Sequence, residues 1–317
     1  MKRLVTAVFL FTAGFCLQGQ AQIGVIADKA YVLDTLKTNS YSAGLSFLFY
    51  VSDNEMKEHT NYRFANSGHF TWLFEKTDIE ASLRQIVERQ SDGEWISNDF
   101  VLLSSGIHKY RPIGDGKTIL RKTYAEPIFI YQDNSDRGLR RRFQAGALFH
   151  PWGLIRPKFN VNVGLGIVRD WSSWEVNDAE EIAAASPELR EKIEFINSRV
   201  DLRKGMYQDH SEWRPMLLLT MHYRLNERVN FNINTSYQQS LKSPYSSEIK
   251  AVYHDLKRVY PYILTQFDIH VNLYKGLSMS LSTTIDYENS NLSLYKSSWA
   301  YSTLIGFSWT FSNQAVR

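Results

Sequence analysis

The chain has 317 residues, with 36 basic and 33 acidic side chains; its net charge of +3 excludes the strong positive field of a nucleic-acid-binding protein. Aromatic residues make up 14% of the sequence, which suits a membrane barrel with girdles of aromatic side chains. The single cysteine, Cys16, excludes an intramolecular disulfide framework.

The amino terminus has the pattern of a secretory signal. Lys2 and Arg3 precede an apolar stretch over residues 4–17, and Gly19-Gln20-Ala21 provides small residues for cleavage. A membrane anchor is the alternative, but the apolar stretch is shorter than the roughly 18 residues that a spanning helix needs. We therefore expect a signal peptide over 1–21, export, a periplasmic segment over 22–38, and a mature chain without cysteine.

From residue 39 onward, large apolar side chains recur at every second position, as in strands with one apolar face. In 156–171, for example, Phe159, Val161 and Val163 alternate with Asn160 and Asn162. The same alternation predicts strands at 39–52, 61–75, 79–90, 98–110, 124–133, 138–150, 156–171, 213–225, 229–238, 259–273, 277–288 and 298–311. Segment 79–90 could instead be a short helix, and ten strands are the alternative count.

The predicted connections fall into two classes, as in outer-membrane barrels. Lower turns are expected at 76–78, 111–122, 151–157, 226–227 and 274–276. Upper loops are expected at 53–60, 91–97, 134–137, 172–212, 239–258 and 289–297. The long loop 172–212 contains a predicted helix that starts with Ser186 as N-cap and Pro187 at its first position.

This helix has one apolar face, formed by Leu189, Ile193, Ile196 and Val200. Because an isolated amphipathic helix is marginally stable, we expect it to dock on the barrel rim or over the mouth. It would act there as a shield for the rim or as a lid.

The orientation of the apolar faces decides the fold class. Several polar faces consist mostly of Ser, Asn, Gly and Thr, and many segments have 11 to 15 residues, long enough to cross a bilayer when tilted. These features favour an all-β, transmembrane, antiparallel up-and-down β-barrel over 39–311, with a tail at 312–317. The alternative is a soluble periplasmic β-sandwich that acts as a binding protein.

In such a barrel the polar faces line the lumen. The candidate lumen residues toward the outer end are Arg140, Arg142, Arg214, Asp170 and Asp286, and those toward the periplasmic end are Glu126, Lys158, His222, Arg224, Asp268 and His270. Between them we expect mostly amides, hydroxyls and glycines. The outer arginines would either favour anions in a pore or pair with carboxylates and hold the lumen shut. We favour a narrow or plugged lumen.

An outer-membrane lipid hydrolase is a second functional hypothesis, with Ser236 joining His222, Asp268 and His270 in a Ser/His/Asp set. Ser236, however, is expected toward the opposite end of the lumen from the other three. The chain also has no nucleophile-elbow, metal-site or nucleotide-binding motif. We therefore predict neither catalysis nor a cofactor or metal.

Two adjoining segments, "YQDNSDRGLRRRFQAGALFHPWG" (131–153) and "FNVNVGLGIVRDWSSWE" (159–175), resemble the family of salt-induced outer-membrane proteins, a domain-of-unknown-function family. The matching positions are Asp133, Asn134, Gly138, Leu139, Arg142, Gly146, Gly164 and Gly166. The chain departs from the family pattern in "SDNEMKEHT" after the first strand, in the insertion 172–212 and in the six residues after Phe311. The resemblance implies an outer-membrane barrel with no assigned activity and no catalytic residues to transfer.

Together these features predict a monomer in the outer membrane of a diderm bacterium, inserted by the barrel-assembly machinery. Its partners would be outer-membrane lipid and lipopolysaccharide, with no nucleic acid. Its role would be passage of small solutes through a narrow pore or a stress-related structural function in the envelope.

Overall fold

The protein, seen in a computed structural model, is described over residues 40–54, 59–73, 77–89, 95–114, 116–134, 139–175, 186–199, 207–243, 245–254, 261–274, 277–288 and 299–312. The predicted signal peptide, the segment 22–38 and residues 313–317 of the predicted tail lie outside these ranges. No helix within the described ranges is long and apolar enough to cross a membrane.

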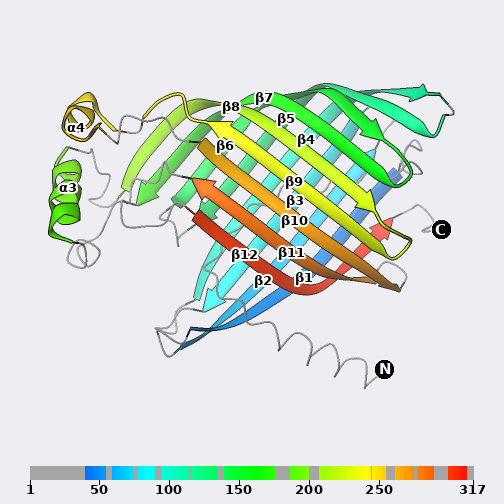
Figure 1. The fold of residues 1–317 in the computed structure, drawn as a ribbon, viewed down its shortest axis with the longest axis horizontal. Helices are drawn as coiled ribbons and strands as arrows, with labels where there is room; N and C mark the ends of the chain where they lie inside the picture. The colour runs from blue at the N-terminus through cyan, green and yellow to red at the C-terminus, as the bar shows by residue number, and fades with distance from the viewer. Residues whose placement is uncertain are drawn as a thin grey trace.

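Twelve strands form one closed antiparallel sheet in which every strand pairs with its neighbours in sequence and β1 pairs with β12 (Figure 1). They are β1 (Ser40–Asn54), β2 (His59–Leu73), β3 (Thr77–Arg89), β4 (Trp95–Ile113), β5 (Thr118–Asn134), β6 (Leu139–Ile155), β7 (Phe159–Glu175), β8 (Tyr207–Arg224), β9 (Val229–Gln239), β10 (Pro261–Tyr274), β11 (Leu277–Glu288) and β12 (Trp299–Ser312). The predicted up-and-down barrel is confirmed. A sandwich of two sheets and a ten-strand barrel are both wrong, and segment 79–90 is a strand rather than a helix.

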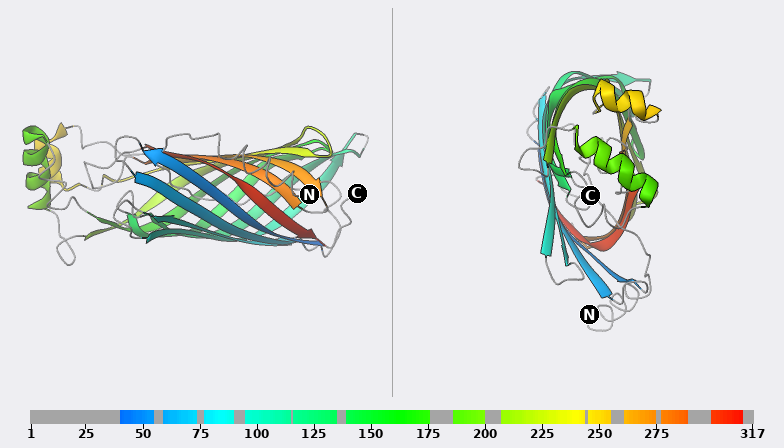
Figure 2. Two further views of the ribbon diagram at one scale, coloured as in Figure 1. Left: turned by 90° about the horizontal axis from the view of Figure 1, so that it is seen from below. Right: turned by 90° about the vertical axis from the view of Figure 1, so that its left-hand side faces the viewer.

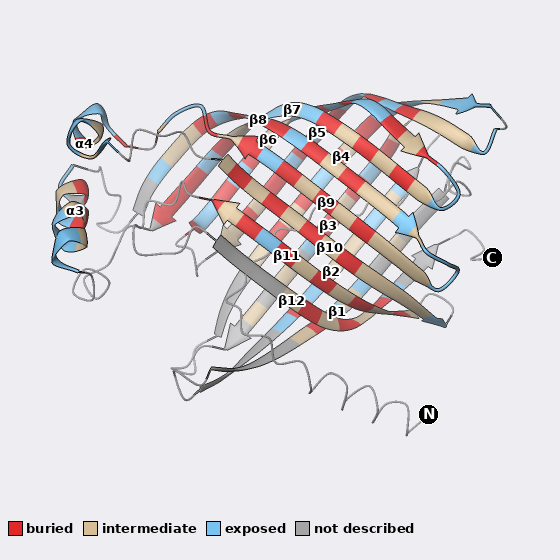
Figure 3. Ribbon diagram, viewed as in Figure 1, coloured by how far each residue is buried: buried red, intermediate tan, exposed pale blue. Residues whose placement is uncertain are grey.

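Buried and exposed residues alternate along the strands (Figure 3), and large apolar side chains are among the exposed residues. On β8, Leu217 is 42% exposed, whereas the next residue, Leu218, is 6% exposed. On β1, Phe47 is 62% exposed, and Leu48 is buried. Apolar side chains exposed on the outside of the barrel would be unfavourable in water, but they are suited to a lipid environment.

Two levels on the outer surface combine aromatic rings with a basic side chain. At one level, the Arg169 guanidinium lies 5.9 Å from the Trp171 ring and 5.6 Å from the Trp213 ring. At the other, Lys122 Nζ lies 5.2 Å from the Tyr124 ring and 5.4 Å from the Phe149 ring. Basic groups stacked on aromatic rings are typical of the two interfaces of a membrane.

The length of the outward face of β8 fits a bilayer. Along β8 the outward residues run from Trp213 to Tyr223, and both side chains are exposed. Ten residues at ~3.3 Å each, tilted by about 40°, span roughly 25 Å along the barrel axis, the height of the apolar band in outer-membrane barrels.

β-Bulges shift the inward and outward faces on β6. The register with β7 changes between Leu139 and Arg141, so that Leu139 and Arg142 are buried while Arg140 and Arg141 are exposed. A second shift lies between Phe149 and Trp152.

The strands are also longer at the end where β1 begins than the sequence pattern predicted. β4 and β5 continue as far as Ile113 and Thr118, and Gly114 and Gly116 between them have φ of 61° and 74°. Glycine adopts these positive φ values without the strain that a Cβ would cause. The predicted long turn at 111–122 is thus mostly strand, and so is 151–155 of the predicted turn 151–157.

The barrel has a flattened, oval cross-section, with β6–β7 at one narrow end and β12 beside β1 at the other (Figure 2). Glycines at both ends allow close approach of neighbouring backbones. A Cβ on Gly146 would lie 2.2 Å from the Ile167 carbonyl oxygen, and one on Gly306 would lie 2.1 Å from the Phe47 carbonyl oxygen. Only glycine fits where the sheet bends this sharply.

Two helices, α3 (Pro187–Asn197) and α4 (Ser247–Val252), lie at the end of the barrel opposite the start of β1 (Figures 1 and 2). Ser186 caps α3 by accepting a hydrogen bond from Leu189 N at 3.3 Å, as predicted. An apolar cluster joins the helices to the rim of the barrel and comprises Leu139, Trp174, Ile196, Tyr245 and Ile249. The helix therefore docks on the rim, as expected; Val200, predicted to belong to its apolar face, lies outside the described residues.

Candidate functional site in the barrel lumen

The lumen is crossed at the level of Trp171 and Trp213 by ion pairs between distant strands. Arg142 on β6 donates from Nη1 to Glu288 Oε2 on β11 at 2.9 Å, and its Nε lies 3.0 Å from Asp170 Oδ2 on β7. The guanidinium also lies over the rings of Trp174 and Tyr262, at 5.3 and 5.1 Å. Arg142 is completely buried.

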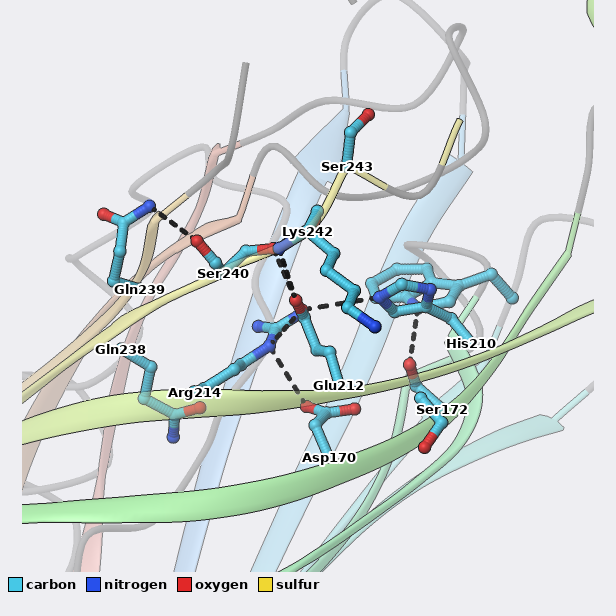
Figure 4. A network of polar contacts seen from close by, with 12 residues as sticks. Asp170, Ser172, His210, Glu212, Arg214, Gln238, Gln239, Ser240, Lys242 and Ser243 are labelled. Atoms are coloured by element: carbon cyan, nitrogen blue, oxygen red, sulfur yellow. Dashed lines mark hydrogen bonds and ion pairs between the residues drawn. The ribbon is translucent and has the colours of Figure 1, made fainter. Parts of the chain in front are cut away.

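A second arginine completes this network (Figure 4). Arg214 on β8 donates from Nε to Glu212 Oε1 at 2.7 Å and from Nη1 to Glu288 Oε1 at 3.1 Å. The other oxygen of Glu212 accepts a hydrogen bond from Ser240 Oγ at 2.6 Å. Glu288 thus binds both arginines.

Two glutamines bind one another next to these ion pairs. Gln144 Nε2 donates to Gln238 Oε1 at 2.8 Å and to Asp170 Oδ2 at 2.6 Å, and Gln238 Nε2 donates back to Gln144 Oε1 at 3.1 Å. We call the seven residues of this network the outer plug; they are Arg142, Gln144, Asp170, Glu212, Arg214, Gln238 and Glu288. Each is at most 1% exposed, so the outer plug fills the part of the lumen between β6 and β11 at this level.

Apolar side chains line the lumen next to the outer plug, toward the end of the barrel where β1 begins. They come from β4, β5, β6, β7, β8 and β10 and include Phe100, Leu102, Leu148, Met216, Leu218 and Leu264. They border a cavity of about 40 Å³, which we call the apolar chamber. The sequence analysis expected amides, hydroxyls and glycines in the middle of the lumen, and that expectation is wrong for this region.

Polar groups border the chamber at its other end. Glu126 on β5 lies 2.7 Å from His150 Nε2 on β6, and the Nδ1 atom of His150 lies 2.8 Å from Asn162 Nδ2 on β7. A Cβ on Gly164 would come within 2.7 Å of the His150 ring, so this glycine makes room for the imidazole.

A third polar cluster lies on β3, β4 and β5. His108 Nε2 is 2.9 Å from Asp78 Oδ2, and Arg121 Nε donates to His108 Nδ1 at 3.2 Å. A second cavity of about 20 Å³ nearby is lined by Arg121, His222 and Asn234, and shares Thr220 with the apolar chamber.

The structure brings together some of the predicted lumen residues and separates others. Arg142, Arg214 and Asp170 meet in the outer plug. Asp286 is buried on the inner face of β11. Arg140 is exposed because it is the bulged residue of β6, and Lys158 is exposed in the turn between β6 and β7; the lumen positions predicted for these two are wrong.

The residues that were predicted toward the periplasmic end have separate local partners. His222 binds Asn232, His270 Nδ1 lies 2.8 Å from Ser280 Oγ, and Asp268 accepts from Gln266 at 2.9 Å. Arg224 is half-buried next to the turn and donates its backbone N–H to the Lys158 carbonyl at 2.8 Å.

The proposed Ser/His/Asp set does not assemble. Among the described residues, Ser236 forms no hydrogen bond with His222 or His270, and each histidine is bound to a residue outside the set. No group of three or more potential metal ligands is found in the described ranges.

The sequence analysis missed Glu212, Glu288, His150 and the cluster of Asp78, His108 and Arg121. Glu212 fell inside the predicted loop 172–212, although it has the same parity as Arg214 two residues later. Glu288 has the parity of Asp286 and ends its strand. The predicted lumen residues stop at Arg214 and Asp286. Continuing each alternation by two residues, to Glu212 and to Glu288, would have placed both carboxylates in the lumen.

The sequence matches no protein-family model and no curated protein. Solved barrel structures resemble the fold. The NanC porin aligns over 84% of this chain and 98% of its own, with 10% identity and a TM-score of 0.43. An outer-membrane channel from Pseudomonas putida F1 aligns over 91% and 100%, with 8% identity and a TM-score of 0.45. Outer membrane phospholipase A from Escherichia coli aligns over 86% and 90%, with 13% identity and a TM-score of 0.38. At this level of similarity none of them assigns a function to this chain.

Proposed function

We propose that this protein is a monomeric outer-membrane barrel with a narrow pathway for small solutes, closed in this conformation by the outer plug. The exposed apolar band and its two aromatic levels support contact with outer-membrane lipid and lipopolysaccharide. The resemblance to salt-induced outer-membrane proteins stays a prediction, and a stress-related role in the envelope is the alternative that it suggests.

One observation carries the proposal: the ion pair between Arg142 and Glu288, which joins β6 to β11 inside the lumen. The plug is built entirely from side chains on strands, so opening it requires rotamer changes rather than removal of a folded domain. A lumen blocked in this way can alternate between closed and open states.

The test measures current across a planar bilayer. Arg142→Ala removes one of the two largest side chains of the plug together with its bonds to Glu288 and Asp170. Arg141→Ala is the matched control, because Arg141 is the neighbouring residue but is exposed. We expect low conductance for the native protein and for Arg141→Ala, and clearly higher conductance for Arg142→Ala.

If the folded Arg142→Ala barrel conducts no more than the native protein, the pathway is not gated by the plug and the proposal fails. In that case a structural role in the envelope becomes the better-supported function. Fractionation of cells with detergent-free buffer adds a second test, because recovery of the protein in the soluble fraction would contradict membrane insertion.

A further inference from the structure

Three polar side chains that line the second cavity each have a buried atom without a hydrogen-bond partner. They come from three neighbouring strands, Asn162 from β7, His222 from β8 and Asn234 from β9. Asn162 and Asn234 are 7% and 2% exposed. Within the described part of the chain, Asn162 Oδ1, His222 Nε2 and Asn234 Nδ2 form no hydrogen bond. Because nearly all buried polar groups in proteins have a partner, three such residues lining one cavity indicate a bound ligand.

The size of the cavity limits this ligand to a water molecule or a single ion. A cavity needs about 10–15 Å³ to hold a water, and the second cavity has about 20 Å³. Gly153 also lines it, and a Cβ at this position would lie 2.9 Å from Asn162 Oδ1. The missing side chain of Gly153 therefore leaves space beside this oxygen.

The contacts of His150 determine that Asn162 offers an acceptor to this ligand. His150 Nε2 lies 2.7 Å from Glu126 Oε2. Because a carboxylate oxygen and an unprotonated nitrogen would repel one another at this distance, Nε2 carries the proton of the neutral ring. His150 Nδ1 is then an acceptor, to which Asn162 Nδ2 donates at 2.8 Å. The remaining polar atom of the Asn162 amide is its oxygen.

His222 offers a second acceptor, and Asn234 offers a donor. His222 Nδ1 is hydrogen-bonded to Asn232 Oδ1. An amide oxygen only accepts hydrogen bonds, so Nδ1 carries the proton of the neutral imidazole and Nε2 keeps its lone pair. The Nδ2 atom of Asn234 is a donor. The three atoms without partners are therefore two acceptors and one donor.

We propose that the second cavity binds one water molecule, which donates to Asn162 Oδ1 and His222 Nε2 and accepts from Asn234 Nδ2. A water has two donors and can accept, and a buried water typically makes about three hydrogen bonds. Chloride cannot donate to the two acceptors, and sodium cannot accept from the Asn234 amide. The water links β7, β8 and β9 on the inner wall of the barrel.

The charge of Arg121, which also lines the cavity, would by itself favour an anion. Its guanidinium is already engaged, because Nε donates to His108 at 3.2 Å and Nη2 lies 3.8 Å from Asp78 Oδ2. None of the seven residues of the outer plug lines the second cavity. Binding of the water therefore does not depend on conductance through the plug, and this inference goes beyond the proposed function.

The experiment is a high-resolution crystal structure of the whole barrel, with parallel crystals soaked in bromide and in rubidium. Both ions scatter anomalously, so they distinguish an anion site or a monovalent-cation site from a water site. Thr220→Ile fills the cavity, because Thr220 lines it and isoleucine is larger. Thr235→Ile is the matched control, because Thr235 lies on the outward face of β9, between two buried residues.

We expect one density peak without anomalous signal, about 2.7–3.2 Å from Asn162 Oδ1, His222 Nε2 and Asn234 Nδ2. The peak should be retained in Thr235→Ile and lost in Thr220→Ile. An anomalous peak from bromide or rubidium would overturn the assignment to water. Absence of a peak in the native barrel, or direct hydrogen bonds among the three side chains, would overturn the site itself. Gly153→Ala, whose methyl group would press on Asn162 Oδ1, replaces Thr220→Ile if that variant does not fold.

Discussion

The unequal charge of the outer plug predicts that its arginines and carboxylates are not equally important for stability. Arg142 contacts Glu288 and Asp170, and Glu288 in turn contacts both arginines. Arg142→Met leaves three buried carboxylates with one arginine. Glu288→Gln leaves two carboxylates with two arginines and keeps a side chain of the same shape. The first variant increases the charge imbalance, and the second removes it.

The magnitudes follow from these contacts. Leaving a buried charge without its partner costs about 3–5 kcal/mol, which we expect for Arg142→Met. Glu288→Gln exchanges charge-assisted hydrogen bonds for neutral ones, a loss of about 1 kcal/mol for each bond. Relief of the charge imbalance offsets part of that loss, so we expect a cost of about 1–2 kcal/mol for Glu288→Gln.

The assay is reversible unfolding in guanidinium from lipid vesicles, followed by tryptophan fluorescence and by gel migration. The double variant Arg142→Met/Glu288→Met should lose less stability than the two single methionine variants added together, because neither charge is then left alone. Strictly additive losses, or a larger loss for Glu288→Gln than for Arg142→Met, would refute the idea that the buried pair and its charge balance hold the plug.

Three further predictions concern the barrel wall and use the same unfolding assay. Leu217→Arg, on the outward face near the middle of β8, should cost about 2–4 kcal/mol, whereas Tyr223→Arg near the membrane boundary should cost about 0–1 kcal/mol; equal costs would contradict the assigned lipid band. Gly306→Ala should prevent closure of β12 on β1, because its Cβ would lie 2.1 Å from a backbone oxygen that cannot rotate away; recovery of a folded, heat-modifiable barrel would contradict this. Gly164→Ala should be milder, because the clash at 2.7 Å is with the His150 side chain, and it should be relieved in Gly164→Ala/His150→Ala.

The fold could be predicted from the sequence because the period of two is a local signal. Each strand shows its own alternation, and an even number of long strands with short turns on one side leaves few other topologies. The helix α3 was equally local, since Ser186, Pro187 and the apolar spacing all lie within one segment. The boundaries were less accurate, because exposed ends such as 111–113 lack a clear change of residue type.

The inner face was harder to predict for two physical reasons. Bulges change parity without any mark in the sequence, and the bulge at Arg140 moved that residue out of the lumen and Leu139 into it. Consecutive apolar residues also hide parity: in the run Leu217-Leu218-Leu219, the middle residue lines the chamber and its two neighbours face outward. Period-two analysis detects an apolar outer face but not an apolar inner one.

The closure of the lumen depends on contacts that no local pattern contains. Arg142 and Glu288 are 146 residues apart in sequence and meet only because the barrel is closed and flattened. Strand number alone did not decide between a filled and an open lumen, since about eight strands leave a filled interior and about 16 leave a channel. The oval cross-section decides between a filled and an open lumen. Glycines in β6, β7 and β12 permit the two sharp bends of the oval, and the bends bring facing walls within reach of one another's side chains. A twelve-stranded barrel of circular cross-section would separate these walls, so the same arginines and carboxylates would line a pore instead of closing one.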